Sequence, residues 1–259
     1  MPSELLTERV GPVLVLTISD PSTRNTLSRQ VIAAGVEALG VAESDTTLRC
    51  VILRGDGAHF CAGGNLQGLM ERRAAGPPAQ RQMLEHLHQL IEALRVFPKP
   101  VIACVEGAAA GAGFSLALAC DLIVAAADAR FILSYGRIGL SPDGGATWSL
   151  SQAVPRALLQ QLLWLGDPVS AQHLHACGLV GWLADSGQAF SEALRVAQRL
   201  AGMAPNALAS AKELAQQAGT QTLSQQLAAE RDHFIANLFH ANAAEGLQAI
   251  VEKRPPAFR

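Results

Sequence analysis

Two short stretches of small residues stand where an apolar, strand-like run gives way to a helix-like one, at residues 60–66 and 106–113. At such a turn the first backbone N–H groups of the helix have no intrahelical partner, and the positive end of the helix dipole lies behind them. Small residues let a ligand atom come close to this backbone. Two such amides from turns distant in sequence could converge on one carbonyl oxygen and stabilise its negative charge on enolisation.

A carboxyl group that could move the proton follows at Asp143, in the string Ser-Pro-Asp-Gly-Gly of residues 141–145. Pro142 restricts the backbone before a predicted helix, and the two glycines leave the carboxylate room to reach a substrate. Asp is also a favoured N-cap residue, so a purely structural role for Asp143 as a helix cap is the alternative. The two roles are compatible with each other.

Alternating strand-like and helix-like runs must position these turns. Short apolar runs at residues 10–18, 48–54, 101–105 and 121–125 predict strands. Helical spacing of apolar residues predicts helices from residue 27, where Asn25 or Thr26 could act as the cap, over 81–96 and over 114–120. This order is typical of parallel strands joined by crossovers, with helices covering the sheet.

Beyond residue 154 the pattern changes to helices separated by proline, glycine and serine, with one strand-like piece at 179–183. From residue 191 onward the apolar period is helical throughout. The sequence therefore predicts an α/β core over residues 1–190, which carries the site, and a helical region over residues 191–259.

Composition narrows the classes of partner. The chain has 259 residues, of which 49% are hydrophobic, a formal net charge of −2 and a sequence pI of about 6.4. No dense run of Lys and Arg indicates binding to nucleic acid or to an anionic membrane. The apolar stretch 101–127 is interrupted by Glu106 and Asp121, which favours a buried strand and helix over a membrane span.

Other features argue for a reduced, metal-free interior. The five cysteines are odd in number and mostly lie in apolar runs, as is typical of core thiols in a cytosolic protein, and the N-terminus carries no export signal. His86 and His88, like His173 and His175, lie two residues apart and would point to different faces of a helix. Because no phosphate-binding loop is present either, we expect neither a metal nor a nucleotide cofactor.

Taken in order, the motifs resemble those of the crotonase superfamily, the enoyl-CoA hydratase and isomerase proteins, nearly from end to end. The segments that carry the resemblance are residues 24–27, 59–66, 99–107, 120–123, 178–180 and 251–254. The resemblance implies a crotonase (ClpP/crotonase-type) spiral of ββα units with two roughly perpendicular sheets. It also implies a C-terminal helical trimerisation region, with homotrimers that often pair into hexamers.

The resemblance further implies an acyl-CoA thioester as the ligand, so coenzyme A arrives with the substrate and no separate cofactor is needed. It places the two oxyanion-hole amides at Gly64 and Ala112. It implies that main-chain groups hold the adenine end of CoA and that Arg24 lies near the CoA phosphates. It also implies that two residues of the C-terminal tail reach the ligand of a neighbouring subunit. The residues concerned are Arg24, Ala62, Gly63, Asn65, Leu66, Lys253 and Phe258. The alternative for Arg24 is an ordinary solvated charge at a helix start.

The substitutions at two positions distinguish possible reactions. Hydration of an enoyl thioester needs two carboxyl groups around a water molecule, and in the family these are two glutamates. Ser115 and Tyr135 occupy those positions here, which argues against efficient hydratase activity. They are instead candidates for contact with the substrate.

Asp143 lies in a string, residues 138–148, that resembles the branch of the family rearranging double bonds or ring-opened aromatic acyl-CoAs, including phenylacetyl-derived ones. The leading hypothesis is an isomerase in which Asp143 shuttles a proton. The alternatives are hydratase-like activity, an aromatic acyl-CoA dehalogenase with Asp143 as nucleophile, and a non-catalytic acyl-CoA-binding oligomer.

Overall fold

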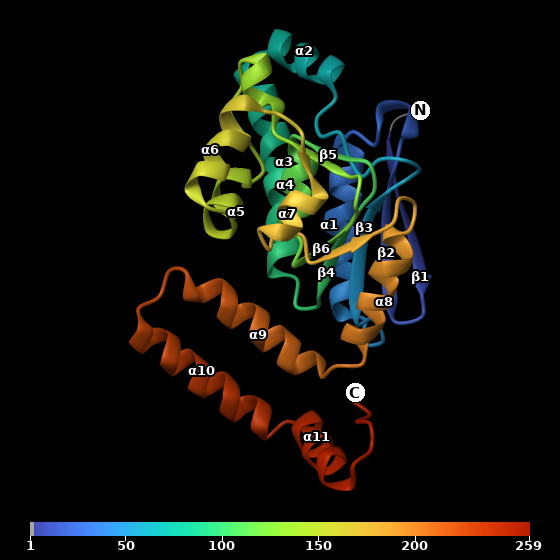
Figure 1. Ribbon diagram of the computed structural model, residues 1–259, viewed down its shortest axis with the longest axis vertical. Coiled ribbons are helices and arrows are strands. Elements are labelled where there is room, and N and C mark those ends of the chain that lie inside the picture. Colours follow the sequence, from blue (N-terminus) through green and yellow to red (C-terminus); the bar gives the residue numbers. More distant parts are fainter. Residues whose placement is uncertain (1–2) are drawn as a thin grey trace.

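The computed structural model describes residues 3–259 and is built around a six-stranded sheet (Figure 1). The strands lie in the order β1-β2-β3-β4-β6-β9, and every neighbouring pair is parallel except the antiparallel hairpin of β1 and β2. Their bounds are β1 Glu4–Val10, β2 Val13–Ser19, β3 Cys50–Gly55, β4 Val101–Val105, β6 Leu122–Ala126 and β9 Trp182–Ala184. The predicted parallel core is thus confirmed, whereas the predicted strand at 10–18 is in fact a turn followed by β2.

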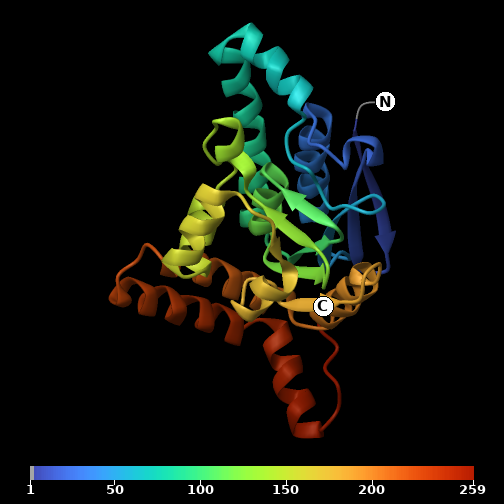
Figure 2. The same ribbon diagram turned by 45° about the horizontal axis from the view of Figure 1, so that its top comes forward.

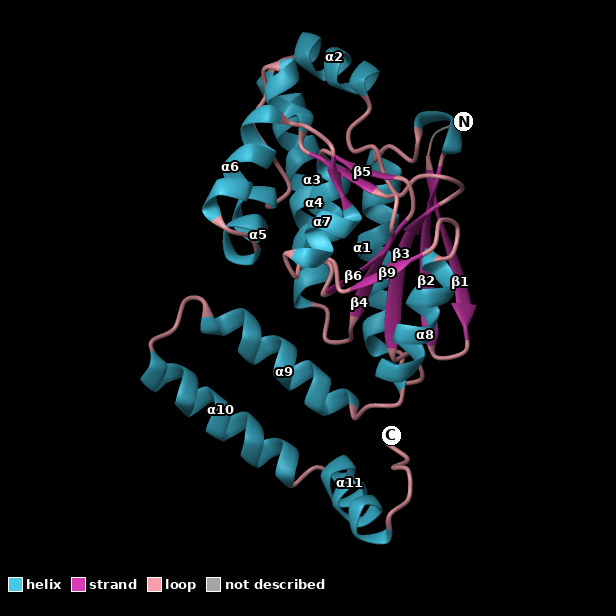
Figure 3. Ribbon diagram, in the orientation of Figure 1, coloured by secondary structure: helices cyan, strands magenta, loops and turns pink. Residues whose placement is uncertain are grey.

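A second, three-stranded sheet lies beside the first (Figure 3) and contains β5 Ala108–Ala110, β7 Arg130–Ile132 and β8 Val169–Ser170. β5 and β7 each follow a strand of the large sheet within a few residues, so a strand of each sheet precedes the next helix. An isolated bridge between Cys61 and Ala109 joins the edge of this sheet to the turn after β3.

Helices cover the sheets. They are α1 Arg29–Ser44, α2 Leu66–Ala75, α3 Pro77–Val96, α4 Ala112–Ala119, α5 Ala146–Ala153, α6 Arg156–Leu165 and α7 Ala171–Ala176, with short 3-10 turns η1 Pro21–Thr23 and η2 Ser134–Ile138. The predicted cap of the first helix at Asn25 or Thr26 is wrong. Ser28 is the N-cap, and its side chain accepts a hydrogen bond from the Val31 N–H.

The last four helices are α8 Ala189–Ala201, α9 Pro205–Ala218, α10 Leu223–Leu238 and α11 Ala241–Glu252. Buried side chains of α8 pack onto β3 and β4, so this helix is part of the core although the predicted division falls near its start. By contrast, α9 to α11 run along one side of the core and α11 projects away from it (Figures 1 and 2). The predicted helical region of residues 191–259 thus includes most of α8 as well as α9, α10 and α11.

The interior is apolar, as the composition predicted. Four of the five cysteines are buried, and none of the five forms a disulfide. None of the helices in residues 3–259 combines the length and apolar character needed to cross a membrane.

Candidate active site

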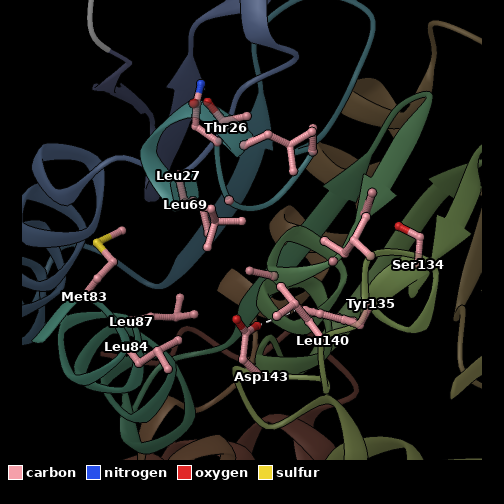
Figure 4. Close-up of a pocket in the computed structure, with 18 of the residues that line it drawn as sticks. Thr26, Leu27, Leu69, Met83, Leu84, Leu87, Ser134, Tyr135, Leu140 and Asp143 are labelled. Atoms are coloured by element: carbon pink, nitrogen blue, oxygen red, sulfur yellow. Dashed lines mark hydrogen bonds between the residues drawn. The ribbon is translucent and has the colours of Figure 1, made fainter. Parts of the chain in front are cut away.

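One cavity of about 800 Å³ is formed where five segments distant in sequence meet (Figure 4). Its walls come from residues 22–27 after β2, residues 62–67 at the start of α2, the middle of α3, residues 110–112 before α4 and residues 134–143 around η2. Gly64, Ala112 and Asp143, the three residues predicted to be catalytic, all line this cavity.

The two small-residue turns lie directly against each other. The Cys61 N–H donates to the Ala108 carbonyl (3.1 Å), and the Ala110 N–H donates to the Cys61 carbonyl (2.8 Å). Gly63 has a φ of +84°, and a Cβ atom there would lie 2.6 Å from the Ala110 carbonyl oxygen and 2.9 Å from the Ala112 nitrogen. Only glycine fits this conformation and this contact, so Gly63 lets the neighbouring Gly64 approach the start of α4.

The amides of Gly64 and Ala112 are available to a ligand. Ala112 is the first residue of α4, and the earliest hydrogen bond at that end runs from the Phe114 N–H to the Gly111 carbonyl (3.0 Å). Gly64 lies just before Asn65, the N-cap of α2. Among residues 3–259 neither N–H has a recorded acceptor, so both could donate to an oxyanion in the cavity.

Asp143 also lines the cavity, and Figure 4 shows its carboxyl group beside Tyr135 and Leu140. Tyr135 Oη donates to Asp143 Oδ1 at 2.6 Å. Burial raises the pKa of the Asp143 carboxyl, while the Tyr135 hydrogen bond and the positive charge of a protonated His88 act in the opposite direction. A carboxyl group with a raised pKa is suited to taking up a proton and releasing it again.

Asp143 is not a helix cap. The N-cap of α5 is Gly145, and no side chain caps that helix. The alternative structural role of Asp143 as an N-cap is therefore wrong, and its side chain serves the cavity wall instead.

Ser115 and Tyr135, the residues at the hydratase glutamate positions, lie on either side of Asp143. Ser115 is buried in α4 and does not line the cavity; its Oγ donates to the Asp143 main-chain carbonyl at 2.9 Å. Tyr135 is buried but its side chain faces the cavity. Asp143 is thus the only acid of residues 3–259 among the residues that line the cavity.

The residues predicted to bind CoA divide into several groups. Arg24, Ala62, Asn65 and Leu66 line the cavity, while Gly63 packs behind it. Arg24 has a left-handed φ of 59°, and its carbonyl accepts from the Ala62 N–H, so it is part of a fixed loop rather than a helix start. Asn65 Oδ1 accepts from the Gly68 N–H, so its side chain caps α2.

Lys253 and Phe258 lie away from this cavity in the same chain. Lys253 is the left-handed C-cap of α11, and the Phe258 ring packs against Gly246. Their contact with a neighbouring subunit's ligand stays a prediction.

Two features of the site were missed. Asn25 is fully buried; its side-chain amide donates to the Asp56 and His59 carbonyls, and its Oδ1 accepts from the Asp20 N–H, so it ties together the loops that form one wall. The apolar wall was also missed. It is formed largely by Leu27, Leu69, Met83, Leu84, Leu87 and Leu140. The helical spacing of Met83 and Leu87 was a signal for this face of α3.

Comparison with known proteins of similar sequence identifies the family of this chain. The family described as enoyl-CoA hydratase/isomerase matches residues 8–259. The chain belongs to this family. It is 35% identical over 247 residues to a 1,2-epoxyphenylacetyl-CoA isomerase of Escherichia coli K12, covering 95% of this chain and 94% of that protein. It is 34% identical to a 2,3-dehydroadipyl-CoA hydratase of the same organism, covering 99% of both.

Solved structures agree with this membership in the enoyl-CoA hydratase/isomerase family. An enoyl-CoA hydratase from Polaromonas sp. JS666 superposes with a TM-score of 0.98 at 54% identity, covering 99% of this chain and 100% of that one. The crotonase fold predicted from the motifs is therefore confirmed. Because the relatives include both isomerases and hydratases, the family alone leaves the specific reaction open.

Within the described part of the chain, no three His, Cys, Asp or Glu side chains are grouped so that they could hold a metal ion. The cavity lining offers the backbone at Gly64 and Ala112, the carboxyl group of Asp143 and the phenol of Tyr135, together with other polar side chains that include Arg24 and Arg72.

Proposed function

We propose that this member of the enoyl-CoA hydratase/isomerase family is an enoyl-CoA isomerase that moves a double bond along an acyl-CoA thioester. The observation that carries the proposal is the carboxyl group of Asp143, the one acid among residues 3–259 that lines the cavity, which the turns containing Gly64 and Ala112 also line. One carboxyl group is sufficient for a proton shift within one face of a substrate, whereas hydration uses two.

The proposed reaction begins with the ionised Asp143 carboxylate and a 3-enoyl-CoA. Asp143 removes a proton from the α-carbon, and the electron pair of that C–H bond moves into the thioester to form a dienolate. The Gly64 and Ala112 amides donate to the resulting oxyanion. The protonated Asp143 then returns the proton to the γ-carbon, which leaves a 2-enoyl-CoA and restores the carboxylate.

The cavity walls support an apolar acyl group as the substrate. Leucine and methionine side chains from α2, α3 and the loop after η2 line the same cavity as Asp143. Burial is the cause of the raised pKa of the Asp143 carboxyl group. The isomerase relative in Escherichia coli acts on a ring epoxide, so an aromatic-derived acyl group is included in the proposal.

A hydratase-like reaction is the second candidate, because a relative of similar identity is named a hydratase. It would need a second proton-transfer group in place of the missing glutamate. Tyr135 is poorly suited to act as a base, since burial and the Asp143 charge raise the pKa of its hydroxyl group and keep it protonated.

A substrate panel tests the proposal. Purified protein would be given 3-enoyl, 2-enoyl and ring-epoxide CoA esters, and the products identified by mass spectrometry and NMR. We expect double-bond or ring isomers from the wild type and none from Asp143→Asn. The matched control is Asp128→Asn, an exposed acid in the β6–β7 turn, which should retain wild-type turnover. A hydroxyacyl-CoA as the main product, or no product from any ester, would overturn the proposal.

We also propose that the chain forms homotrimers, or dimers of trimers, through its C-terminal helices. The family resemblance supports this assembly, as does the apolar surface that α10 and α11 expose, which includes Leu223, Phe234, Phe239, Ile250 and Val251. Sedimentation analysis would test it, and a monomer at micromolar concentration would contradict it.

A further inference from the structure

We propose that Tyr135 and Ser115 jointly position the Asp143 carboxyl group, so that Oδ1 is held and Oδ2 is left to exchange the proton with substrate. The inference rests on the proposed function, because it assigns roles around the same carboxyl group. The two residues at the glutamate positions both form hydrogen bonds to Asp143 and together hold it in place.

The Tyr135 hydroxyl group fixes the orientation of the carboxyl group. Its hydrogen bond to Oδ1 is 2.6 Å long, and within the described residues no protein donor is recorded for Oδ2. The bond also closes the loop between η2 and α5, together with the hydrogen bond from the Leu140 N–H to the Tyr135 carbonyl (3.0 Å). Tyr135 therefore holds both the side chain and the loop that carries it.

Ser115 fixes the main chain of the same residue. Its hydroxyl group donates to the Asp143 carbonyl oxygen at 2.9 Å from α4, the helix whose first residue is Ala112. Ser115 also lies close to the next residue, Gly144, where an added Cβ would lie 2.8 Å from the Ser115 Cβ. Gly144 has a φ of +57°, so glycine suits this position in both conformation and space. The helix that offers one oxyanion amide thus also sets the position of the proton-transfer residue.

The charges around Asp143 define the expected pH behaviour. Tyr135 faces it from η2, His88 on α3 lowers the pKa of the carboxyl group through its charge, and α4 contributes the neutral Ser115. Because a hydrogen bond from a phenol stabilises the ionised carboxylate, it lowers a pKa that burial has raised. Removing the phenol hydroxyl should therefore raise the pKa of Asp143 further.

Two variants that each lose one hydroxyl group test this directly. In Tyr135→Phe we expect the acidic limb of the kcat/KM profile for isomerisation to move to higher pH by about one unit, which corresponds to about 1.4 kcal/mol. In the matched variant Ser115→Ala the lost hydrogen bond is to the main chain. We expect a lower kcat, by roughly tenfold, with the acidic limb unmoved. An unmoved limb in Tyr135→Phe, or a kcat unchanged in Ser115→Ala, would overturn the inference.

A spectroscopic measurement keeps the phenol hydroxyl group in place. Tyr135 is the only tyrosine in the chain, so biosynthetic incorporation of 3-fluorotyrosine labels this position alone. We expect one ¹⁹F resonance whose shift titrates with the same midpoint as the acidic limb, and no such titration in Asp143→Asn. A resonance in the wild type that ignores this ionisation would contradict the proposed contact.

The two proposals fail differently. If Asp143→Asn remains an active isomerase, the proposed function fails. If Asp143→Asn is inactive but Tyr135→Phe keeps the wild-type pH profile, the function stands and the positioning role fails.

Discussion

The helices α4 and α10 both carry apolar side chains, but these are buried in α4 and not in α10. All eight residues of α4 are buried, and the helix is apolar on every side. None of the sixteen residues of α10 is buried, although it carries several leucines, an isoleucine and a phenylalanine. In α4 the apolar residues fix the position of Ala112, whose amide is proposed to bind the oxyanion. In α10 they are exposed and are available for contact with other copies.

The buried core, rather than the exposed helices, fixes the geometry of the cavity. The cavity depends on backbone groups, and backbone groups are held only as firmly as the core packed behind them. No described residue of α9, α10 or α11 lines the cavity. Substitutions in the core should therefore damage both stability and catalysis, and those in the exposed helices should change association.

The largest effect is expected at Gly63, where the two oxyanion turns meet. In Gly63→Ala the new Cβ would clash with the Ala110 carbonyl and the φ of +84° would become strained, so we expect a loss of isomerase activity of roughly 100-fold. Steady-state kinetics measures this loss.

Gly11→Ala is the matched control for that variant. Gly11 has a similar φ of +59° but no atom within 4 Å of its added Cβ, so it carries the strain without the clash. We expect a loss of about 1–2 kcal/mol of stability and no change in kcat. Equal kinetic losses in the two variants would contradict the role of the close contact.

Truncation within α4 should be the next largest effect. Leu116 is fully buried, and Leu116→Ala should lower the free energy of unfolding by about 2–5 kcal/mol because it leaves a cavity in the core. Urea denaturation measures this change. A loss below about 1 kcal/mol would show that α4 is less tightly packed than the structure indicates.

A smaller effect is expected where α9 meets the core. Lys212 Nζ lies 2.9 Å from Asp121 Oδ2, and burial raises the pKa of the Asp121 carboxyl while Lys212 lowers it. Lys212→Met should destabilise the protein by about 1.5–3 kcal/mol at pH 7, because a poorly solvated carboxylate loses its counter-charge.

The loss of stability in Lys212→Met should depend on pH through the ionisation of Asp121. Without Lys212 the folded-state pKa of Asp121 rises further above its unfolded value, so the folded state binds the proton more tightly. The deficit of Lys212→Met relative to the wild type should shrink as the pH falls through this folded-state pKa. Thermal unfolding at pH 7 and pH 4.5 measures it, and a deficit that grows on acidification would be inconsistent with this pair.

The smallest effect on the fold is expected on α10. Phe234 is 67% exposed, so Phe234→Ser should change the unfolding free energy of the single chain by no more than about 0.5 kcal/mol. Size-exclusion chromatography with light scattering should show weaker association. A large loss of monomer stability without a change in mass would contradict the assignment of this face to assembly.

Much of the core was predictable because its chemistry is local. The run of residues 101–105 is apolar at every position, and such a run is typical of a strand buried on both faces. The small-residue turns and Asp143 were predictable because few other residue types suit these positions.

The features that were not predicted depend mostly on contacts between residues distant in sequence. The strand β1 was not predicted, because it lies at the sheet edge and its residues are mostly exposed and polar. Asn25 was predicted to cap a helix because Asn favours caps, whereas its partners, Asp56 and His59, lie more than 30 residues away. The hydrogen bond from Tyr135 to Asp143 likewise could not be predicted, because it depends on the conformation of the loop between η2 and α5.

The most direct test of the central claim is exchange of the substrate α-proton for deuterium, followed by NMR in deuterated buffer with a 3-enoyl-CoA. We expect rapid exchange or transfer of that proton in the wild type and none above the uncatalysed rate in Asp143→Asn. Exchange at the wild-type rate in Asp143→Asn would show that another group removes the proton, and would contradict the account.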